Sequence, residues 1–368
     1  MGYVAVKGGT AAIENAERFR ELRRSAPGVP PPTVAQVRSA LHLAVDRVMG
    51  EGSLYAPDLA ALALKQAAGD PLEAAFILRA YRTTLPRRGA TLPIATSGMR
   101  IVRRISAAFK EIPGGQVLGP TADYTLRLLD FELDADPQAA RERLLRELRA
   151  AEAGPLPPEL PKVIDLLRRE GLLVESRSLR RAPERLVDVT REALTFPAPR
   201  SARLQALARG ETGGLLALAY SNMRGYGSVH PVIGELRVGT VPVRIRRPED
   251  GGEETIGEIL VTEAEVIARI GEGEGGARFG LGYGLCFGHN ETKAIAMAVL
   301  DRALDSEEPS SPSEDEEFVL THVDGIESMG FCNHYKLPHY VTFQSDLDRL
   351  RAIRGGGAAA KGDGRDEA

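Results

Sequence analysis

Apolar residues in the first third of the chain recur at steps of three and four, the period of a helix. The pattern predicts helices over residues 10–24, 33–49 and 57–68. Asp70, Pro71 and Glu73 mark the start of another helix, because an aspartate can cap free backbone amides and proline fits the first helical turn. This helix is predicted to end near Leu85. Residues 1–131 are therefore predicted to be a mainly helical N-terminal region.

The sequence of segment 100–112 is compatible with either a helix or a strand. Its isoleucines at 101, 105 and 112 have helical spacing, yet β-branched side chains also suit a strand. Residues 132–200 follow with a charged helical stretch, a proline-rich stretch and basic irregular sequence. We predict that residues 132–200 are a variable connecting region.

Short apolar runs separated by glycine and proline dominate the chain after about residue 215, a pattern typical of strands. Strands are predicted over residues 215–220, 235–245, 258–262, 279–287 and 318–323. Asn290 is predicted to cap a helix over residues 291–304, and a second helix is predicted over residues 344–353. The predicted fold class is α+β, with a β-rich C-terminal region at 201–354 and a disordered tail at 355–368.

Composition narrows the class of protein. A chain of 368 residues with 43% hydrophobic and 27% charged residues is typical of a soluble globular protein. It has no apolar run of the roughly 20 residues that cross a bilayer, no export signal at its start, and only two cysteines. We therefore expect a cytoplasmic protein without a membrane partner. A net charge of -4 provides no global attraction for nucleic acid, so any anion site must be local.

The segment 332–339 contains two histidines, His334 and His339, at a spacing common in zinc sites. Pro338 between them argues against a helix, so a turn is expected. Cys332 and His322 are nearby and are possible further ligands. The alternative is that both histidines are ordinary loop residues, and two ligands alone do not decide between these interpretations.

Two segments have the composition of an anion site. Arg100, Arg103, Arg104 and Lys110 form the densest basic patch and precede a glycine-rich turn, which suits a polyphosphate, although a solvated helix face would look the same. Glycines precede the helix predicted at 291–304, at positions 280, 282, 284 and 288. They resemble a phosphate cradle, but equally they could provide clearance for a neighbouring backbone.

No residue is singled out as the catalytic acid. The chain has no nucleophile elbow of the G-x-S-x-G kind and no H-E-x-x-H zinc motif. Acidic or phenolic groups that could act at a sugar are Asp123, Tyr124, Asp130, Glu258 and Glu263. Their spacing does not distinguish among them, so the catalytic residues stay unknown at this stage.

Several segments resemble the PhnI family, the I subunit of the bacterial carbon–phosphorus lyase core complex. They include YVAVKGG at 3–9, LAVDRVM at 43–49, LAALALKQ at 59–66, LRAYRTT at 78–84, IPGGQVLGP at 112–120, LLALAYS at 215–221, RGYG at 224–227, DEEFVL at 315–320 and KLPHY at 336–340. The matches run in family order from residue 3 to about 345. Residues 132–200 and the tail resemble the family only loosely.

The resemblance implies a subunit that assembles with the G, H and J subunits into a two-fold core, on which ABC-type ATPase subunits dock. It implies transfer of the ribose 5-triphosphate moiety of ATP to a phosphonate such as methylphosphonate, with release of adenine, and purine nucleosidase activity of the subunit alone. It also implies that His334 and His339 are zinc ligands completed by the J subunit. The basic patch at Arg100–Lys110 would then bind the triphosphate. The rival hypothesis is a non-catalytic scaffold that contributes metal ligands to a site shared with the J subunit.

Overall fold

The computed structural model describes residues 9–24, 27–134, 137–150, 160–174, 186–224, 230–273, 276–306 and 308–362. The chain divides into two compact units. The larger comprises Val34–Asp324, and the smaller combines Met1–Thr33 with Gly325–Ala368. Each unit is described by itself.

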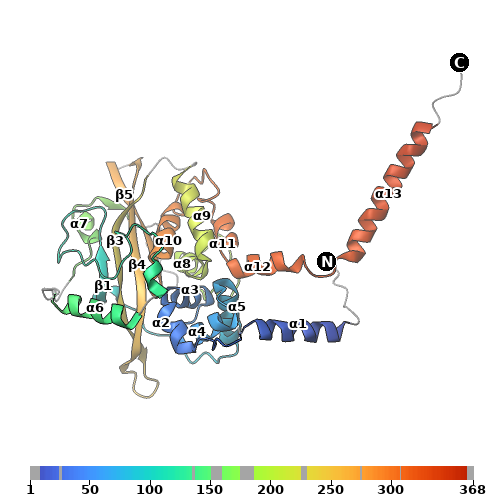
Figure 1. Cartoon of the computed structure of the whole chain (residues 1–368). Helices are drawn as coiled ribbons and strands as arrows, with labels where there is room; N and C mark the ends of the chain where they lie inside the picture. The colour runs from blue at the N-terminus through green and yellow to red at the C-terminus, as the bar shows by residue number, and fades with distance from the viewer. Residues whose placement is uncertain are drawn as a thin grey trace. The chain divides into compact units, whose positions relative to one another are not determined.

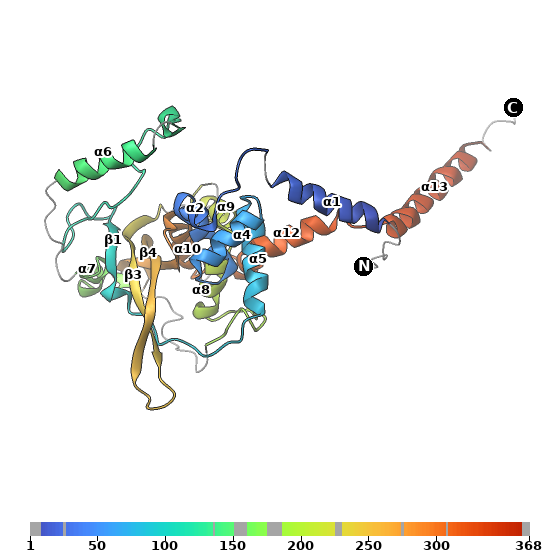
Figure 2. The same cartoon turned by 60° about the horizontal axis from the view of Figure 1, so that its bottom comes forward.

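A five-stranded sheet organises the larger unit (Figure 1). Its strand order is β1-β3-β4-β5-β2, and all neighbours are antiparallel except β2 and β5. The strands are β1 (Arg100–Ile105), β2 (Leu173–Val174), β3 (Val232–Arg246), β4 (Glu253–Gly273) and β5 (Gly276–Phe287). The β3–β4 hairpin extends well beyond the helices in Figures 1 and 2. The prediction of strands at 235–245, 258–262 and 279–287 is confirmed, as is the α+β class.

Helices α8 (Arg200–Arg209), α9 (Thr212–Met223) and α10 (Glu291–Ala303) cover one face of this sheet. Their core includes Leu207, Leu215, Leu236 and Leu300. The other face packs in part against α7 (Ile164–Arg169), whose Ile164 meets Ile267 and Leu281.

The glycines of β5 let α10 approach the sheet closely. A Cβ on Gly282 would lie 1.9 Å from the Ala298 carbonyl oxygen, and one on Gly284 would lie 2.1 Å from that of Ala294. Both distances are far below van der Waals contact. Clearance for a neighbouring backbone therefore explains these two glycines.

Four helices form a second core within the larger unit: α2 (Val34–Ala40), α3 (His42–Gly52), α4 (Pro57–Gln66) and α5 (Pro71–Thr83). The predicted cap of α5 is confirmed, since Asp70 accepts hydrogen bonds from the amides of Leu72 and Glu73 at 2.9 and 3.1 Å. The single helix predicted over residues 33–49 is instead two helices, because the backbone leaves helical geometry at Leu41.

Two predicted strands are helices. Residues 215–220 belong to α9, whose start is capped by Glu211 through the amides of Gly213 and Gly214. Residues 318–323 lie largely in α11 (Glu316–His322), capped by Asp315. Both segments are short apolar runs, which periodicity alone cannot assign. The ambiguous segment 100–112 begins with strand β1.

The remaining elements are α6 (Pro137–Ala150) and the short 3-10 turns η1 (Thr96–Gly98) and η2 (Phe131–Asp134) in the larger unit, and α1 (Thr10–Arg23), α12 (Gly325–His334) and α13 (Tyr340–Gly362) in the smaller. None of the residues of α1 or α12 is buried. The predicted tail begins inside α13, and its residues 363–368 lie outside the described part. Across the described residues, no helix is both long and apolar enough to cross a membrane.

Candidate active site at the start of helix α10

A cavity of about 490 Å³ lies at the N-terminus of α10. Four segments far apart in the sequence form its walls: the start of α3, the loop 120–123, Thr212 at the start of α9, and residues 289–293. The lining side chains that carry charge or can titrate are His42, Arg47, Asp123, His289, Glu291 and Lys293. Acids, imidazoles and cations therefore meet in one cavity large enough for a small ligand.

The turn that leads into α10 depends on Gly288. Its φ is +72°, and a Cβ at this position would lie 2.3 Å from Asp46 Cγ. The bare backbone lets the next amide, that of His289, donate to Asp46 Oδ2 at 2.8 Å. Burial raises the pKa of Asp46, while this hydrogen bond and the charges of His42 and His289 partly offset the effect.

A chain of charged groups follows the cavity wall. Glu291 Oε1 lies 2.8 Å from His289 Nε2 and 2.7 Å from Arg103 Nε, although the Arg103 N–H is not aimed at it. Arg103 is only 1% exposed, donates to the Leu118 carbonyl at 2.5 Å and pairs with Asp123. Arg103 thus holds two cavity carboxylates, Glu291 and Asp123, in fixed positions.

A buried network supports the cavity from below. Lys293 is fully buried, and its Nζ donates to the Gly210 carbonyl at 2.8 Å. Burial lowers the pKa of Lys293, and the nearby Glu51 opposes that change. Glu51 in turn accepts from Arg47 Nε at 2.8 Å and from the Thr212 hydroxyl at 2.9 Å. These contacts fix the relative positions of α3, α9 and α10.

The first amides of α10 are not capped by a side chain. Asn290 occupies the N-cap position, but its Nδ2 donates to the Phe287 carbonyl at 2.7 Å instead of its oxygen accepting from α10. The helix predicted over residues 291–304 is confirmed, whereas the capping bond expected from Asn290 is not formed. Glu291, Thr292 and Lys293, whose amides open the helix, all line the cavity. Such amides favour an anion.

The structure does not gather the four cations of the predicted triphosphate site. Arg103 and Arg104 are neighbours on β1, so their side chains point to opposite faces of the sheet. Arg103 reaches the cavity wall, whereas Arg104 is buried against Glu235 at 2.5 Å and against the carbonyls of Pro113 and Pro161. Arg100 is 74% exposed and pairs with Glu258, and Lys110 is exposed. Only Arg103 contacts residues that line the cavity.

Of the predicted acids, only Asp123 lines this cavity. Glu263 is buried on the far face of the sheet, where it pairs with Arg237 and lies 2.9 Å from Lys162 Nζ. Burial would raise the pKa of Glu263, but the charges of Arg237 and Lys162 outweigh it and lower the pKa to about 2. A carboxylate held ionised by a buried arginine and a half-buried lysine is suited to structure and not to proton transfer.

The two predicted metal ligands lie in the smaller unit. His334 ends α12 and His339 immediately precedes α13, with their ring centroids 5.3 Å apart. The Nδ1 of His334 contacts the Phe331 carbonyl, and the Nδ1 of His339 contacts that of Leu337 at 2.6 Å. A histidine that donates through Nδ1 carries its lone pair on Nε2, as many zinc ligands do.

The described residues contain no group of three His, Cys, Asp or Glu side chains placed to hold one metal ion. His322 belongs to the larger unit, and Cys332 is exposed on α12. His334 and His339 fit half of a zinc site, because zinc takes four ligands in a structural site and three protein ligands in most catalytic ones.

The sequence did not indicate four residues at the cavity: His42, Asp46, His289 and Glu291. Their signal was weak because they are brought together only by packing of α3 against the turn before α10. The one local sign was Gly288, a glycine directly before a polar helix start.

Comparison with known proteins gives the family. Residues 2–356 match the family described as "Bacterial phosphonate metabolism protein (PhnI)". A protein of Stutzerimonas stutzeri named "Putative C-P lyase subunit protein HtxH" is 56% identical, with 96% of each chain covered. Proteins of Rhizobium meliloti and Escherichia coli named "Alpha-D-ribose 1-methylphosphonate 5-triphosphate synthase subunit PhnI" are each 48% identical. The alignments cover 99% and 96% of this chain, and 98% of each relative. At this identity over nearly its whole length, the chain belongs to the PhnI family of bacterial phosphonate metabolism proteins.

Proposed function

We propose that this chain is the I subunit of a carbon–phosphorus lyase core complex. It transfers the ribose 5-triphosphate moiety of ATP to a phosphonate such as methylphosphonate and releases adenine. The observation that carries this proposal is the 48% identity, over almost the full length of both chains, to two subunits named for the synthase of that product. By the family resemblance, the subunit alone would act as a purine nucleosidase.

In this reaction the bond between ribose C1′ and adenine N9 breaks, and a bond between C1′ and a phosphonate oxygen forms. Positive charge develops on the ribose, so a carboxylate beside C1′ lowers the barrier, and adenine leaves more readily when a nitrogen takes up a proton. We place this chemistry in the α10 cavity. Glu291 and Asp123 supply its carboxylates, and His289, 2.8 Å from Glu291, supplies the proton.

The opening amides of α10 and Arg47 supply the positive end of the same cavity for phosphate oxygens. Arg103 takes part from behind the wall by holding Glu291 and Asp123. The hypothesis from the sequence that Arg100, Arg104 and Lys110 also bind the triphosphate stays a proposal. Because these three residues lie apart in space, we expect them to have a minor role in binding. Binding energy at the triphosphate would be used to orient C1′ against the phosphonate.

His334 and His339 are the residues that would hold a zinc ion, with the remaining ligands from the J subunit. Bound there, zinc would act either as a Lewis acid or as a structural link between the subunits. This half-site favours the alternative function, a scaffold that lends metal ligands to chemistry in a shared site. The exposed apolar residues of the smaller unit also suit a partner-covered surface: Ile13, Phe19, Leu22, Phe331, Leu337, Val341 and Phe343.

An adenine-release assay decides between the two functions. The purified chain is incubated with ATP in three arms: alone, with the G and H and ABC-type subunits, and with the J subunit added to these. Each arm is run with and without methylphosphonate. We expect adenine release by the chain alone, and methylphosphonate-dependent product only with the partners. Adenine release that needs the J subunit and is absent without it would support the scaffold instead.

A further inference from the structure

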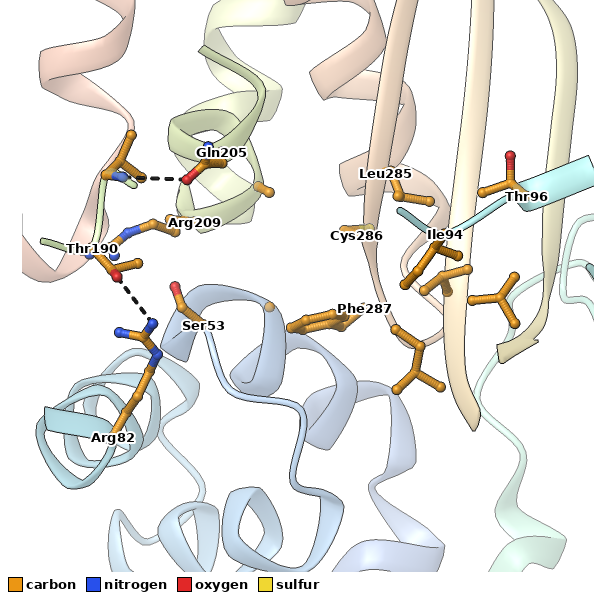
Figure 3. Close-up of a pocket in the computed structure, with 16 residues that line it drawn as sticks. Ser53, Arg82, Ile94, Thr96, Thr190, Gln205, Arg209, Leu285, Cys286 and Phe287 are labelled. Atoms are coloured by element: carbon orange, nitrogen blue, oxygen red, sulfur yellow. Dashed lines mark hydrogen bonds between the residues drawn. The ribbon is translucent and has the colours of Figure 1, made fainter. Parts of the chain in front are cut away.

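A second cavity, of about 250 Å³, lies within the larger unit and shares no lining residue with the α10 cavity (Figure 3). It lies between the middle of β3 and β4, the end of β5, and helices α3, α5 and α8. An apolar cavity of about 150 Å³ is sufficient to bind benzene. This cavity is therefore large enough for a ring-sized group together with a small polar head.

One side of the cavity is apolar. The side chains that form it come mostly from the sheet: Ile94, Val241, Ile259, Val261, Leu285 and Phe287. Phe287 is held in place by an edge-to-face contact with Tyr55, with ring centroids 5.5 Å apart. This rigid apolar wall would accept an apolar substituent and gain from its burial.

The other side is cationic. Arg82 donates to the Thr190 hydroxyl at 3.1 Å. Its neighbours Arg79 and Arg87 pair with Asp324 and Asp188, but among the described residues Arg82 has no carboxylate partner. Burial, and then the positive charges of Arg87, Arg79 and Arg191, lower the pKa of Arg82. The charge of Arg82 is thus left uncompensated at the edge of a cavity.

A buried hydroxyl lies beside that charge. Ser53 ends α3 in the left-handed region at φ 57°, and its Oγ is buried without a hydrogen-bond partner in the described part of the chain. Figure 3 shows this hydroxyl pointing into the space between Arg82 and Arg209. An unsatisfied buried hydroxyl is destabilising unless a ligand or solvent supplies a partner.

We propose that this cavity binds a small organic oxyanion that carries an apolar group. The oxyanion accepts hydrogen bonds from Arg82 and Ser53, and the apolar group lies against Leu285 and Phe287. The geometry of the cavity requires only that the ligand carries both a negative charge and an apolar group. That the head is a phosphonate, so that the cavity selects organophosphonates by their substituent, rests on the proposed function.

The test is titration calorimetry of the assembled complex with phenylphosphonate, inorganic phosphate, benzoate and adenine. The variants are Arg82→Gln and Ser53→Gly, and the matched control is Arg88→Gln, an exposed arginine close by on the chain. Melting temperatures of all variants show whether each one folds. Ser53→Gly also relieves the positive φ, so loss of binding in that variant cannot come from backbone strain.

We expect phenylphosphonate to bind more tightly than phosphate, which lacks the apolar group. Arg82→Gln should weaken it about tenfold or more, since bonds to a charged group are lost, and Arg88→Gln should leave it unchanged. Tighter binding of benzoate than of phenylphosphonate would keep the oxyanion site but reject the phosphonate head. The proposal is overturned if phenylphosphonate fails to bind, if Arg82→Gln does not weaken it, or if adenine binds more tightly.

This measurement needs no turnover. A complex that binds phenylphosphonate but releases no adenine contradicts only the proposed function. A complex that releases adenine but does not bind phenylphosphonate contradicts only the cavity proposal.

Discussion

Substitution of Gly288 by alanine is expected to destabilise the protein and to disturb the turn before α10. Two effects contribute. The residue has φ +72°, and an L-residue in that region costs roughly 1–2 kcal/mol. The added Cβ would also lie 2.3 Å from Asp46 Cγ and 2.4 Å from its Cβ, a contact that must be relieved by displacing the side chain. Overpacking of this kind costs about 1–3 kcal/mol, so the expected total is about 2–5 kcal/mol.

Gly251 provides a matched control. It has the same φ of +72°, but a Cβ there would meet nothing within 4 Å. Gly251→Ala should therefore lose only the backbone part, about 1–2 kcal/mol. In the background of Asp46→Gly, Gly288→Ala should cost no more than Gly251→Ala, because the Cβ and the carboxylate that it meets are both removed.

Equilibrium urea unfolding of the four variants measures these terms. A double-mutant cycle of positions 46 and 288 should give a coupling of about 1–3 kcal/mol. Equal losses for Gly288→Ala and Gly251→Ala, with no coupling to position 46, would refute the argument that Asp46 packs against the turn.

Three further predictions concern pH, nucleotide and metal. The pKa of Glu263 in the folded protein is lowered from 4.5 to about 2, so Glu263 contributes about 3 kcal/mol to the free energy of unfolding above pH 4.5, and this is lost as pH falls toward 2. Glu263→Gln should therefore reduce the fall of stability between pH 4.5 and 2, and an unchanged fall would contradict the pairing. Arg47→Gln should weaken ATP binding by roughly 1.5–3 kcal/mol, because Arg47 lines the cavity, and Arg100→Gln by well under 1 kcal/mol, measured by calorimetry; equal effects would show that Arg100 also binds the triphosphate. His334→Ala should remove most of the zinc from the assembled complex by metal analysis, whereas wild-type zinc content would make His334 an ordinary exposed residue.

Local sequence patterns were sufficient to predict helices whose first residues include a recognisable capping residue. The cap at Asp70 and the proline and acid that follow it predicted α5, and Asn290 at the N-cap position predicted α10, in both instances within a few residues. Helix α9 was predicted as a strand because its apolar run continues onto the exposed side of the helix. Leu216 and Tyr220 are 41% and 54% exposed there, so the run lacks the period that would identify a helix.

The site was harder to predict than the fold for a physical reason. Arg103 and Arg104 look equivalent in sequence, and only the alternation of a strand sends one to α10 and the other to Glu235. Because segment 100–112 fitted helix and strand alike, that separation could not be foreseen. Asp46 and His289 lie 243 positions apart, and their hydrogen bond exists only through tertiary packing.

We propose above all that ribosyl transfer takes place in the α10 cavity. Single-turnover adenine release from ATP by the assembled complex, with His289→Gln compared against wild type, tests it most directly. Loss of a general acid typically lowers the rate by about 10²–10⁴-fold. We expect the rate of adenine release by the His289→Gln complex to fall by a factor in that range, with the complex still intact. A wild-type rate in His289→Gln, combined with loss of adenine release in His334→Ala, would place the chemistry at the metal half-site and contradict the account.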